Sequence, residues 1–567
     1  MRYCALATDY DGTLATGGRV NQSTVEALER FCQSGRKLLL VSGRPLEDLL
    51  KLFPRIDLCD RVVAENGALI YSPETEEQQL LGEPVPQALI DEIHRKGLPD
   101  FHIGHGIINA YEPYQKELLE IIQDLGLEWH LVFNKGNVMV LPAGVNKASG
   151  LMAALKELGL SPRNTVGVGD AENDHAFLAI CEARVAVANA VPSLKEQADL
   201  VTSGAESVGV VELIDQILKD DLASLEQKLK RRQVAIGHDL AGEEIGLHPY
   251  GLNVLVSGYP LSGKSTFARN FIEGLERQGY QYCLIDPEGD YQEADHAVTM
   301  GSENQAPEVQ SVIDLLEKTQ QNCTVDMLSI QYADRPYFFR ELINPLEKLR
   351  EKTGRPHWII LDEAHHLIPS DRSRQASPIP HGSKGLFLIT TSPQNLDPSI
   401  LSEIDLFLFV GRLNEEDLEN LPLDLSGNEA FLGKHAQGEV VAWWNRPGAQ
   451  PFLFKSLPPD GDHMRHRRKY AQGVISPDYS FYFRGPENKL ALRAENLMRF
   501  LELADGVDDE TWNFHLRNGD ITRWFEKIIK DDDLANASRQ AAEQNLSPDE
   551  SRALIRKEVE KHYTGPA

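Results

Sequence analysis

The chain has 567 residues, more than one hydrophobic core usually holds, so we expect three or four domains. With 41% hydrophobic and 25% charged residues it is typical of soluble globular proteins, and no apolar run is long enough to cross a bilayer. A net charge of −29 argues against binding to nucleic acid, except where basic residues cluster. The six cysteines are scattered without a CxxC pair, so we expect reduced core residues in a cytoplasmic protein, not disulfides or zinc ligands.

Residues 1–217 alternate short apolar runs with helical stretches, which predicts a doubly wound α/β sheet. The expected strands are 3–8, 37–41, 61–64, 164–169 and 184–188. Four of these runs are followed by a polar residue, namely Asp9, Ser42, Glu65 and Asp170. Because ligands bind at the carboxyl ends of strands in such sheets, we expect these side chains to converge. Residues 72–140 interrupt the alternation, and we interpret them as an inserted α/β cap.

The polar residues of this block have the chemistry that phosphate-ester hydrolysis needs: a nucleophile, a proton donor and fixed positive charge. Asp9 can attack phosphorus from the end of a buried strand, and Asp11 can protonate the leaving oxygen. Lys147 can supply the cation, and Ser42 can donate to a phosphoryl oxygen. Because close carboxylates repel each other, we expect a divalent cation, and Mg²⁺ suits oxygen ligands and phosphate.

Four motifs in order resemble the haloacid dehalogenase superfamily, and within it the Cof-like phosphatases. They are Asp9-Tyr10-Asp11-Gly12-Thr13, Val41-Ser42-Gly43-Arg44, Gly144-Val145-Asn146-Lys147 and the Gly169–Asp174 segment. The resemblance implies a Rossmann-like fold over 1–217, with Asp9 as nucleophile and Asp11 as acid and base. The implied Mg²⁺ ligands are Asp9, the Asp11 carbonyl, Asp170 and Asp174. The implied phosphate contacts are Ser42, Gly43, Lys147 and Asn173.

The expected cap is short, as in the phosphoglycolate-phosphatase-like members of that group, and leaves room mainly for a small phosphorylated metabolite. His102, His105 and Asn109 are candidates to face the substrate, although such residues are more often polar surface. A binding-only descendant is the alternative to an enzyme. The presence of nucleophile, acid, lysine and metal carboxylates favours catalysis.

The remainder of the chain indicates four further segments. We interpret 218–250 as a linker with a charged helix at 222–233, and 251–457 as a second α/β domain. Its expected strands are 253–256, 282–285, 358–361, 386–389 and 406–409, with a closing hairpin at 438–443 and 451–455. Residues 458–478 indicate another linker. Residues 479–567 indicate a small helical domain, in which we expect His515 and Asp520 to form a structural pair.

A glycine-rich loop, Gly258-x-x-x-x-Gly263-Lys264-Ser265, stands between an expected strand and an expected helix, which is the context of a P-loop. Its backbone N–H groups and the helix N-terminus would hold the phosphates of ATP. Asp362, after another buried strand, would hold Mg²⁺ with Ser265, and Glu363 would polarise the attacking water. The expected ATP-binding residues are Gly258, Ser262, Gly263, Lys264, Ser265 and Thr266.

The loop and its flanking segments, 285–291, 361–365 and 396–401, resemble the HerA/FtsK-like branch of P-loop ATPases over 236–457. The resemblance implies a homo-oligomer, commonly a hexameric ring, and makes DNA a candidate partner. By position, Ser392 or Gln394 is the candidate sensor, and Arg412 is a candidate arginine acting in trans or a surface residue. The basic runs Lys228–Arg232 and Arg465–Lys469 lie in expected linkers. We interpret both as solvated, which argues against strong DNA binding.

The leading hypothesis is a Mg²⁺-dependent phosphatase of a small metabolite, fused to an ATPase that assembles or regulates it. One alternative is an ATP-driven DNA translocase with the phosphatase as accessory or nucleotide-directed effector, and DNA-stimulated ATPase activity would favour it. The other is an ATP-gated scaffold, which ATP-dependent assembly with negligible metabolite turnover would favour. No membrane partner is expected.

Overall fold

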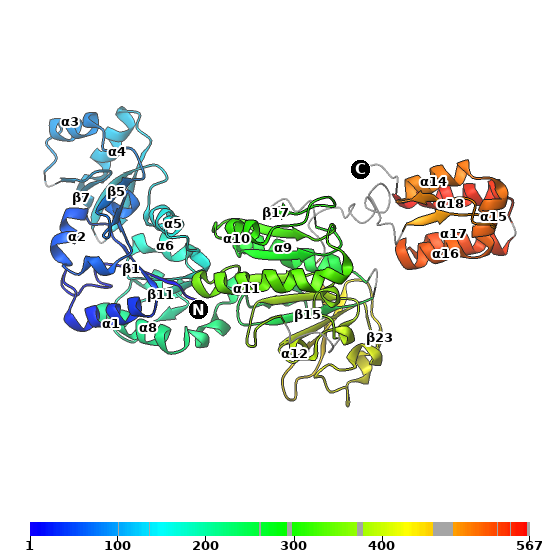
Figure 1. The fold of residues 1–567 in the computed structure, drawn as a ribbon. Coiled ribbons are helices and arrows are strands. Elements are labelled where there is room, and N and C mark those ends of the chain that lie inside the picture. The colour runs from blue at the N-terminus through cyan, green and yellow to red at the C-terminus, as the bar shows by residue number, and fades with distance from the viewer. Residues whose placement is uncertain are drawn as a thin grey trace.

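The computed structural model describes residues 1–563 apart from Asp100, Lys135, 260–261, 292–296, 371–377, 458–479, Lys530 and Asn545. Two α/β blocks come first along the chain, in blue to cyan and in green to yellow, and a mainly helical block follows in orange and red (Figure 1). Among the helices described, none is both long and apolar enough to span a membrane.

Within the described residues, the first sheet has eight strands in the order β12-β11-β10-β1-β2-β3-β4-β5. The strands from β12 to β3 are parallel, and β4 and β5 add an antiparallel edge. The bounds are β1 Ala5–Asp9, β2 Lys37–Val41, β3 Arg61–Ala64, β4 Leu69–Ser72, β5 Glu77–Leu80, β10 Thr165–Gly169, β11 Ala183–Ala186 and β12 Leu200–Val201. The helices of this block are α1 Gln22–Gln33, α2 Leu46–Leu52, α5 Lys147–Glu157, α6 His175–Ile180, α7 Pro192–Gln197 and α8 Glu206–Asp220.

The parallel strands of this sheet are buried along almost their whole length, which explains their continuous apolar runs. β2 and β3 have the expected bounds, and β1 extends one residue further than expected, to Asp9. The α/β fold predicted for this part of the chain is therefore confirmed.

A separate four-stranded sheet, in the order β6-β7-β9-β8, forms the cap together with two helices. Its elements are α3 Gln87–Arg95, β6 His102–Ile103, β7 Ile108–Tyr111, α4 Gln115–Asp124, β8 Trp129–Asn134 and β9 Asn137–Pro142. The insertion begins later than the expected residue 72, because β5 pairs with β4 and belongs to the first sheet. The apolar sides of α3 and α4 pack on the cap sheet in a core of their own.

The second sheet has eleven strands in the part of the chain that is described, in the order β14-β13-β25-β24-β21-β15-β20-β19-β16-β18-β17. From β21 to β17 the strands are parallel, and from β14 to β21 neighbours are antiparallel. The bounds are β13 Val234–His238, β14 Glu244–Leu247, β15 Asn253–Ser257, β16 Tyr282–Asp286, β17 Ala297–Met300, β18 Asn322–Asp326, β19 Trp358–Leu361, β20 Leu386–Thr390, β21 Leu406–Val410, β24 Glu439–Trp444 and β25 Phe452–Ser456. The helices are α9 Lys264–Gln278, α10 Val309–Leu316, α11 Arg335–Thr353 and α12 Pro398–Leu401, and a short pair, β22 Arg412–Leu413 and β23 Gly433–Lys434, forms a sheet of its own.

The segment expected to be a linker, 218–250, is built into both α/β blocks. Leu222, Leu225 and Leu229 are buried in the core of the first block. Two short 3-10 turns, Ala223–Lys228 and Lys230–Arg232, stand where we expected one charged helix. Further along, β13 and β14 pair with each other, and β13 also pairs with β25 at the edge of the second sheet.

The basic run Lys228–Arg232 is solvated only in part, since Lys228 and Lys230 are exposed whereas Arg231 and Arg232 are not. The guanidinium of Arg231 contacts both carboxylate oxygens of Asp199, at 3.1 and 2.6 Å, and Arg232 is buried. Part of this run therefore pairs within the chain. The second basic run, Arg465–Lys469, lies outside the described residues.

The C-terminal block has a small aromatic core under a two-stranded ribbon and helices. Its elements are β26 Phe481–Phe483, β27 Leu492–Ala494, α14 Leu497–Gly506, α15 Asp509–Arg517, α16 Asp520–Trp524, α17 Asp532–Glu543 and α18 Pro548–Tyr563. His515 is buried, and its Nδ1 lies 2.8 Å from Asp520. Its Nε2 accepts hydrogen bonds from the backbone N–H groups of Arg484 and Gly485. This fully bonded imidazole holds the ribbon against α15, as expected of a structural pair.

Candidate active sites

The first cluster lies where β1 and β10 end side by side. Thr8 pairs with Val168 in register, so Asp9 and Asp170 follow neighbouring parallel strands at the same edge of the sheet. Asp9, Asp170 and Asp174 are buried, and one carboxylate oxygen from each lies within 4.8 Å of the others. Of the four strand-end residues expected to converge, Asp9 and Asp170 meet in this cluster, together with Asp174.

Lys147 joins two of these carboxylates. Its Nζ donates to Oδ1 of Asp9 and to Oδ1 of Asp174, both at 2.6 Å, and its side chain is 1% exposed. The other oxygen of Asp174 accepts from the backbone N–H groups of Asp170 and Ala171, at 2.8 and 2.9 Å. These bonds fix the direction in which the Asp174 carboxylate points.

The start of α5 places Lys147. Asn146 caps the helix, accepting from the backbone N–H groups of Ala148 and Ser149, while the Ser149 hydroxyl accepts from the Asn146 N–H. Gly67 has φ +105° and faces Asn146 so closely that a Cβ on Gly67 would lie 2.0 Å from the Asn146 carbonyl oxygen. Only glycine fits there, and Lys147 is consequently held at the first position of the helix.

The electrostatics of the cluster suit a divalent cation. Burial and the Asp174 carboxylate raise the pKa of Asp9 to about 8, although Lys147 acts in the opposite direction. Burial alone would lower the pKa of Lys147, but Asp174 and Asp9 outweigh it and hold that pKa above its usual value. Three carboxylates around one ammonium leave excess negative charge in a buried, oxygen-rich site, which fits Mg²⁺.

Asp11 stands apart from these carboxylates. Both of its carboxylate oxygens accept hydrogen bonds from Arg44, at 2.5 and 2.7 Å, and this bond raises the pKa of Arg44. Ser42 is buried, and its Oγ accepts from the Arg44 backbone N–H. We did not single out Arg44 in the sequence, although it ends the motif that includes Ser42 and Gly43.

A cleft of about 300 Å³ opens between this cluster and the cap. From the core block it is lined by Asp9, Asp11, Gly43, Arg44, Pro45, Lys147, Ala171 and Asn173, and from the cap by Asn109, Asn137 and Met139. Asn173 also donates to Asn66. Of the three expected cap candidates, Asn109 lines the cleft, whereas the ring of His105 contacts Glu65 and His102 is not among the lining residues.

The second candidate site lies at the end of β15. Here Lys264 is the first residue of α9, followed by Ser265 and Thr266, and Gly263 before it has φ +100°. The Nζ of Lys264 donates to the Tyr259 carbonyl at 3.4 Å, within its own loop. A Cβ on Gly258 would lie 2.6 Å from the Ser262 hydroxyl, so these two residues approach each other closely. Pro260 and Leu261 lie outside the described residues.

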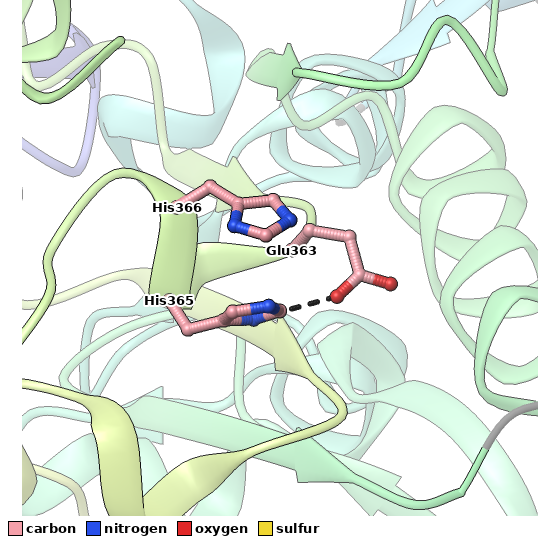
Figure 2. Close-up of side chains that lie close together, drawn as sticks. All are labelled: Glu363, His365 and His366. Atoms are coloured by element: carbon pink, nitrogen blue, oxygen red, sulfur yellow. Dashed lines mark ion pairs between the residues drawn. The ribbon is translucent and has the colours of Figure 1, made fainter. Parts of the chain in front are cut away.

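Asp362 follows β19, which is separated from β15 by β20 alone. Its carboxyl group is buried, and burial together with Glu363 and Asp286 raises its pKa well above the usual value. Next along the chain, Glu363 has a left-handed backbone (φ 40°), and its carboxylate lies 3.4 Å from Nδ1 of His365 (Figure 2). The two acidic residues expected after β19 therefore lie at the end of that strand.

The sensor candidates Ser392 and Gln394 follow β20. The backbone N–H of Ser392 donates to the Thr390 hydroxyl at 3.0 Å, and Oε1 of Gln394 is buried with no hydrogen-bond partner among the described residues. Thr390 ends β20 and its hydroxyl lies 3.0 Å from Nδ1 of His365, a residue that the sequence did not mark. Arg412 bonds Asn414, and its guanidinium lies 5.4 Å from the ring centre of Tyr259 in the P-loop. Arg412 thus lies beside the loop of its own chain.

The first block is similar to known proteins. The sequence profile of haloacid dehalogenase-like hydrolases matches residues 6–103 and 106–214. A phosphoglycolate phosphatase of Methanothermobacter thermautotrophicus is 30% identical over 224 residues, which cover 38% of this chain and 98% of that relative. Phosphoglycolate phosphatase 2 of Saccharolobus solfataricus is 30% identical over 223 residues, or 38% and 91% of the two chains. A solved haloacid dehalogenase-like hydrolase from Bacteroides thetaiotaomicron is 19% identical, covering 38% of this chain and 99% of its own, with a TM-score of 0.33.

Proposed function

Because the N-terminal part of this chain belongs to the haloacid dehalogenase-like hydrolases and has their phosphatase function, we propose that it hydrolyses a small phosphorylated metabolite through an aspartyl-phosphate on Asp9. The observation that carries this proposal is the buried contact of Asp9 with Lys147, next to Asp170 and Asp174. A cleft of about 300 Å³ is at the small end of ligand pockets, which supports a small substrate. The names of the two relatives make phosphoglycolate the first substrate to test.

In the proposed first step, a carboxylate oxygen of Asp9 attacks phosphorus as the bond to the leaving oxygen breaks. Asp11 gives its proton to that oxygen. In the second step Asp11 takes a proton from the water that attacks the aspartyl-phosphate, and Asp9 is regenerated. Because Arg44 bonds both oxygens of Asp11, at least one of these bonds must open for proton transfer.

The remaining residues of the cluster bind and orient. Lys147 holds Asp9 in place and offers positive charge to the phosphoryl oxygens, to which Ser42, the Gly43 backbone and Asn173 would add hydrogen bonds. Asp9, the Asp11 carbonyl, Asp170 and Asp174 would hold Mg²⁺. When bound, the ion would neutralise charge on the phosphoryl group during transfer.

Substitution of the nucleophile tests this mechanism. We expect Asp9→Asn to reduce phosphoglycolate turnover by roughly 10³-fold or more, as loss of a nucleophile does in other enzymes. Phosphate release from the purified full chain measures it, across a panel of phosphorylated metabolites. Asp91→Asn, in helix α3 of the cap, is the matched control and should retain activity. Turnover by Asp9→Asn close to that of the wild type would rule out the aspartyl-phosphate on this residue.

We further propose that residues 251–457 bind and hydrolyse ATP. Support comes from the tight loop between β15 and α9, with Lys264 at the helix N-terminus, and from the buried Asp362 across β20. In this proposal Ser265 and Asp362 hold Mg²⁺, and Glu363 polarises the attacking water. A ring of several copies, with ATP controlling assembly or the phosphatase, remains the proposed role of this block.

Lys264→Ala tests the second site. We expect it to weaken ATP binding by at least roughly tenfold, because the ammonium group is the main charge for the β- and γ-phosphates. Titration with a fluorescent ATP analogue measures the affinity, and Lys434→Ala, in the exposed strand β23, is the control. The phosphatase block should stay folded in both variants. Wild-type ATP affinity in Lys264→Ala would exclude the P-loop assignment.

A further inference from the structure

A second group of metal-type ligands lies directly after Asp362 and plays no part in holding phosphate. Glu363, His365 and His366 come together at the turn after β19, and one ligand atom from each lies within 4.8 Å of the others. Figure 2 shows the two imidazole rings and the carboxylate on the same side of this turn.

The backbone explains why three residues so close in sequence gather their side chains. Glu363 has φ 40° and ψ 51°, and a 3-10 turn, Ala364–His366, follows at once. This reversal brings the Glu363 carboxylate within 3.4 Å of Nδ1 of His365, and the rings of His365 and His366 lie 4.0 Å apart between centres.

The surroundings of His366 shield one of its ring nitrogens from solvent. Its Nδ1 is buried, and among the described residues this atom has no hydrogen-bond partner. The ring of Tyr332, itself 59% exposed, packs edge-on against His366 at 4.7 Å. A buried imidazole nitrogen without a partner is costly unless a ligand completes it.

The donor set distinguishes this cluster from the carboxylate cluster around Asp9. Two imidazoles and one carboxylate suit Zn²⁺ and similar transition-metal ions, whereas Mg²⁺ prefers oxygen ligands and water. Three protein ligands leave a coordination position open for water or another small ligand.

We propose that Glu363, His365 and His366 bind a divalent transition-metal ion of the Zn²⁺ type, separate from the Mg²⁺ expected at Ser265 and Asp362. This metal site has a consequence for regulation, which rests on the proposed ATPase function. The metal occupies the Glu363 carboxylate, so this group no longer polarises water. Zn²⁺ therefore inhibits ATP hydrolysis in this chain.

Metal binding is tested without nucleotide, on the full chain, by titration with Co²⁺ and with Zn²⁺. The wild type should bind one more equivalent of metal ion than His366→Ala does. Its bound Co²⁺ should also show a tetrahedral absorption band that the variant lacks. Both proteins have the carboxylate site around Asp9, so metal bound there adds equally to the two stoichiometries and does not contribute to the difference between them. His381→Ala removes an exposed histidine that contacts Glu403, and should bind as the wild type does.

Glu363→Gln and His366→Gln keep the size of the side chains, and thermal unfolding in chelator shows whether each variant is folded. We expect both to lose the additional equivalent while folded. An equal stoichiometry and equal Co²⁺ spectra in the wild type and in folded His366→Gln would overturn the metal site.

The inhibitory role has its own measurement. Zn²⁺ should inhibit the ATPase of the wild type and of His381→Ala, and a chelator should restore it, while any residual ATPase of His366→Gln should be at least roughly tenfold less sensitive. A wild type that binds the additional Zn²⁺ and hydrolyses ATP at an unchanged rate would overturn inhibition. A wild type that binds it but hydrolyses no ATP would instead overturn the proposed ATPase, with the metal site intact.

Discussion

Asp9 combines two demands that conflict at neutral pH. A nucleophile must be ionised, yet burial and Asp174 raise the pKa of Asp9 to about 8. Without a metal, the folded chain therefore keeps a proton on Asp9 that the unfolded chain releases near pH 4. A cation bound by Asp9, Asp170 and Asp174 would displace this proton, so metal binding and activation of the nucleophile are coupled.

The raised pKa of Asp9 gives a pH dependence of stability with a definite sign. Its contribution to the free energy of unfolding is fully present below about pH 4, and is lost as pH rises through about 8. In chelator, the wild type should therefore melt at a lower temperature at pH 8.5 than at pH 6. Asp9→Asn imitates the protonated form, so its melting temperature should fall less between pH 6 and pH 8.5 than that of the wild type. The two falls should differ by about 2–4 °C for each kcal/mol of difference in the free energy of unfolding.

This effect is measured by thermal unfolding of both proteins at the two pH values, first in chelator and then after Mg²⁺ is added. Mg²⁺ should restore the melting temperature of the wild type at pH 8.5 more than that of Asp9→Asn. Parallel pH profiles of wild type and variant would contradict a proton on Asp9 in the folded chain.

The sequence predicted these site residues unevenly. Asp9, Lys147, Asp170 and Asp174 belong to ordered motifs at strand ends, and parallel pairing brings strand ends together whatever lies between them. The contact of Arg44 with Asp11 depends on a rotamer choice that no spacing encodes. His365 and His366 lay in a segment noted only for Asp362 and Glu363, because their grouping depends on the left-handed turn at Glu363.

At the scale of elements, the turn after β3 connects the core block to the cap. Glu65 is fully buried, and its carboxylate accepts from the backbone N–H groups of His105 and Gly106, at 3.1 and 2.8 Å. A Cβ on Gly104 would lie 2.7 Å from this carboxylate, so the cap loop approaches as closely as glycine permits. Glu65 thereby fixes the loop that precedes β7, the strand that carries Asn109 into the cleft.

Glu65→Ala should loosen the cap, because it removes the acceptor of the buried Gly106 N–H, at a cost of about 1–3 kcal/mol, and of the part-buried His105 N–H. We expect amide hydrogen exchange in residues 104–106 to become faster by roughly tenfold or more. The KM for the metabolite should rise more than kcat falls, because Asp9 and Lys147 are untouched. Glu77→Ala, exposed on β5, serves as the control. Unchanged exchange in residues 104–106 would show that Glu65 does not hold the cap.

Strand recognition from sequence also depended on context. Apolar strands buried on both sides, such as β2 and β19, were expected at their observed bounds. β13 and β14 were expected to be linker, because glycines and charged residues interrupt them, as in Val234-Ala235-Ile236-Gly237-His238. β13 is completed by β25, more than two hundred residues further along the chain, and pairing over such a distance leaves no local pattern.

At the scale of the whole molecule, the two α/β blocks meet at the ends of their strands that lie away from the candidate sites. Asn164 directly precedes β10 and His357 directly precedes β19, and Oδ1 of Asn164 lies 3.0 Å from Nε2 of His357. Asp170 and Asp362 follow the opposite ends of the same two strands. The two candidate sites therefore lie at the ends of these strands that are away from the contact.

Glu182 is the buried charge at that contact. Its carboxylate is 0% exposed and lies 3.3 to 3.5 Å from guanidinium nitrogens of Arg2, Arg163 and Arg232. It also accepts from the hydroxyl of Tyr280, at 3.0 Å, which comes from the second block. Burial and the neighbouring Arg163 lower the pKa of Arg232 to about 10, whereas the Glu182 carboxylate acts in the opposite direction.

Glu182→Ala should destabilise the chain by about 3–5 kcal/mol, because it leaves buried guanidinium groups without their counter-charge. Tyr280→Phe keeps the ring and removes only the hydroxyl that bonds Glu182, while contacts such as that of Asn164 with His357 remain. It should cost about 1.5–3 kcal/mol, the range for a hydrogen bond to a charged group. Asp215→Ala, which breaks the exposed pair with Arg30, is the control and should cost at most about 1 kcal/mol.

Scanning calorimetry of the full chain should show the two blocks of the wild type unfolding together, and two separated transitions in Tyr280→Phe. If Tyr280→Phe instead unfolds as the wild type does, and Lys264→Ala still alters the phosphatase, then the path between the sites does not pass through Glu182.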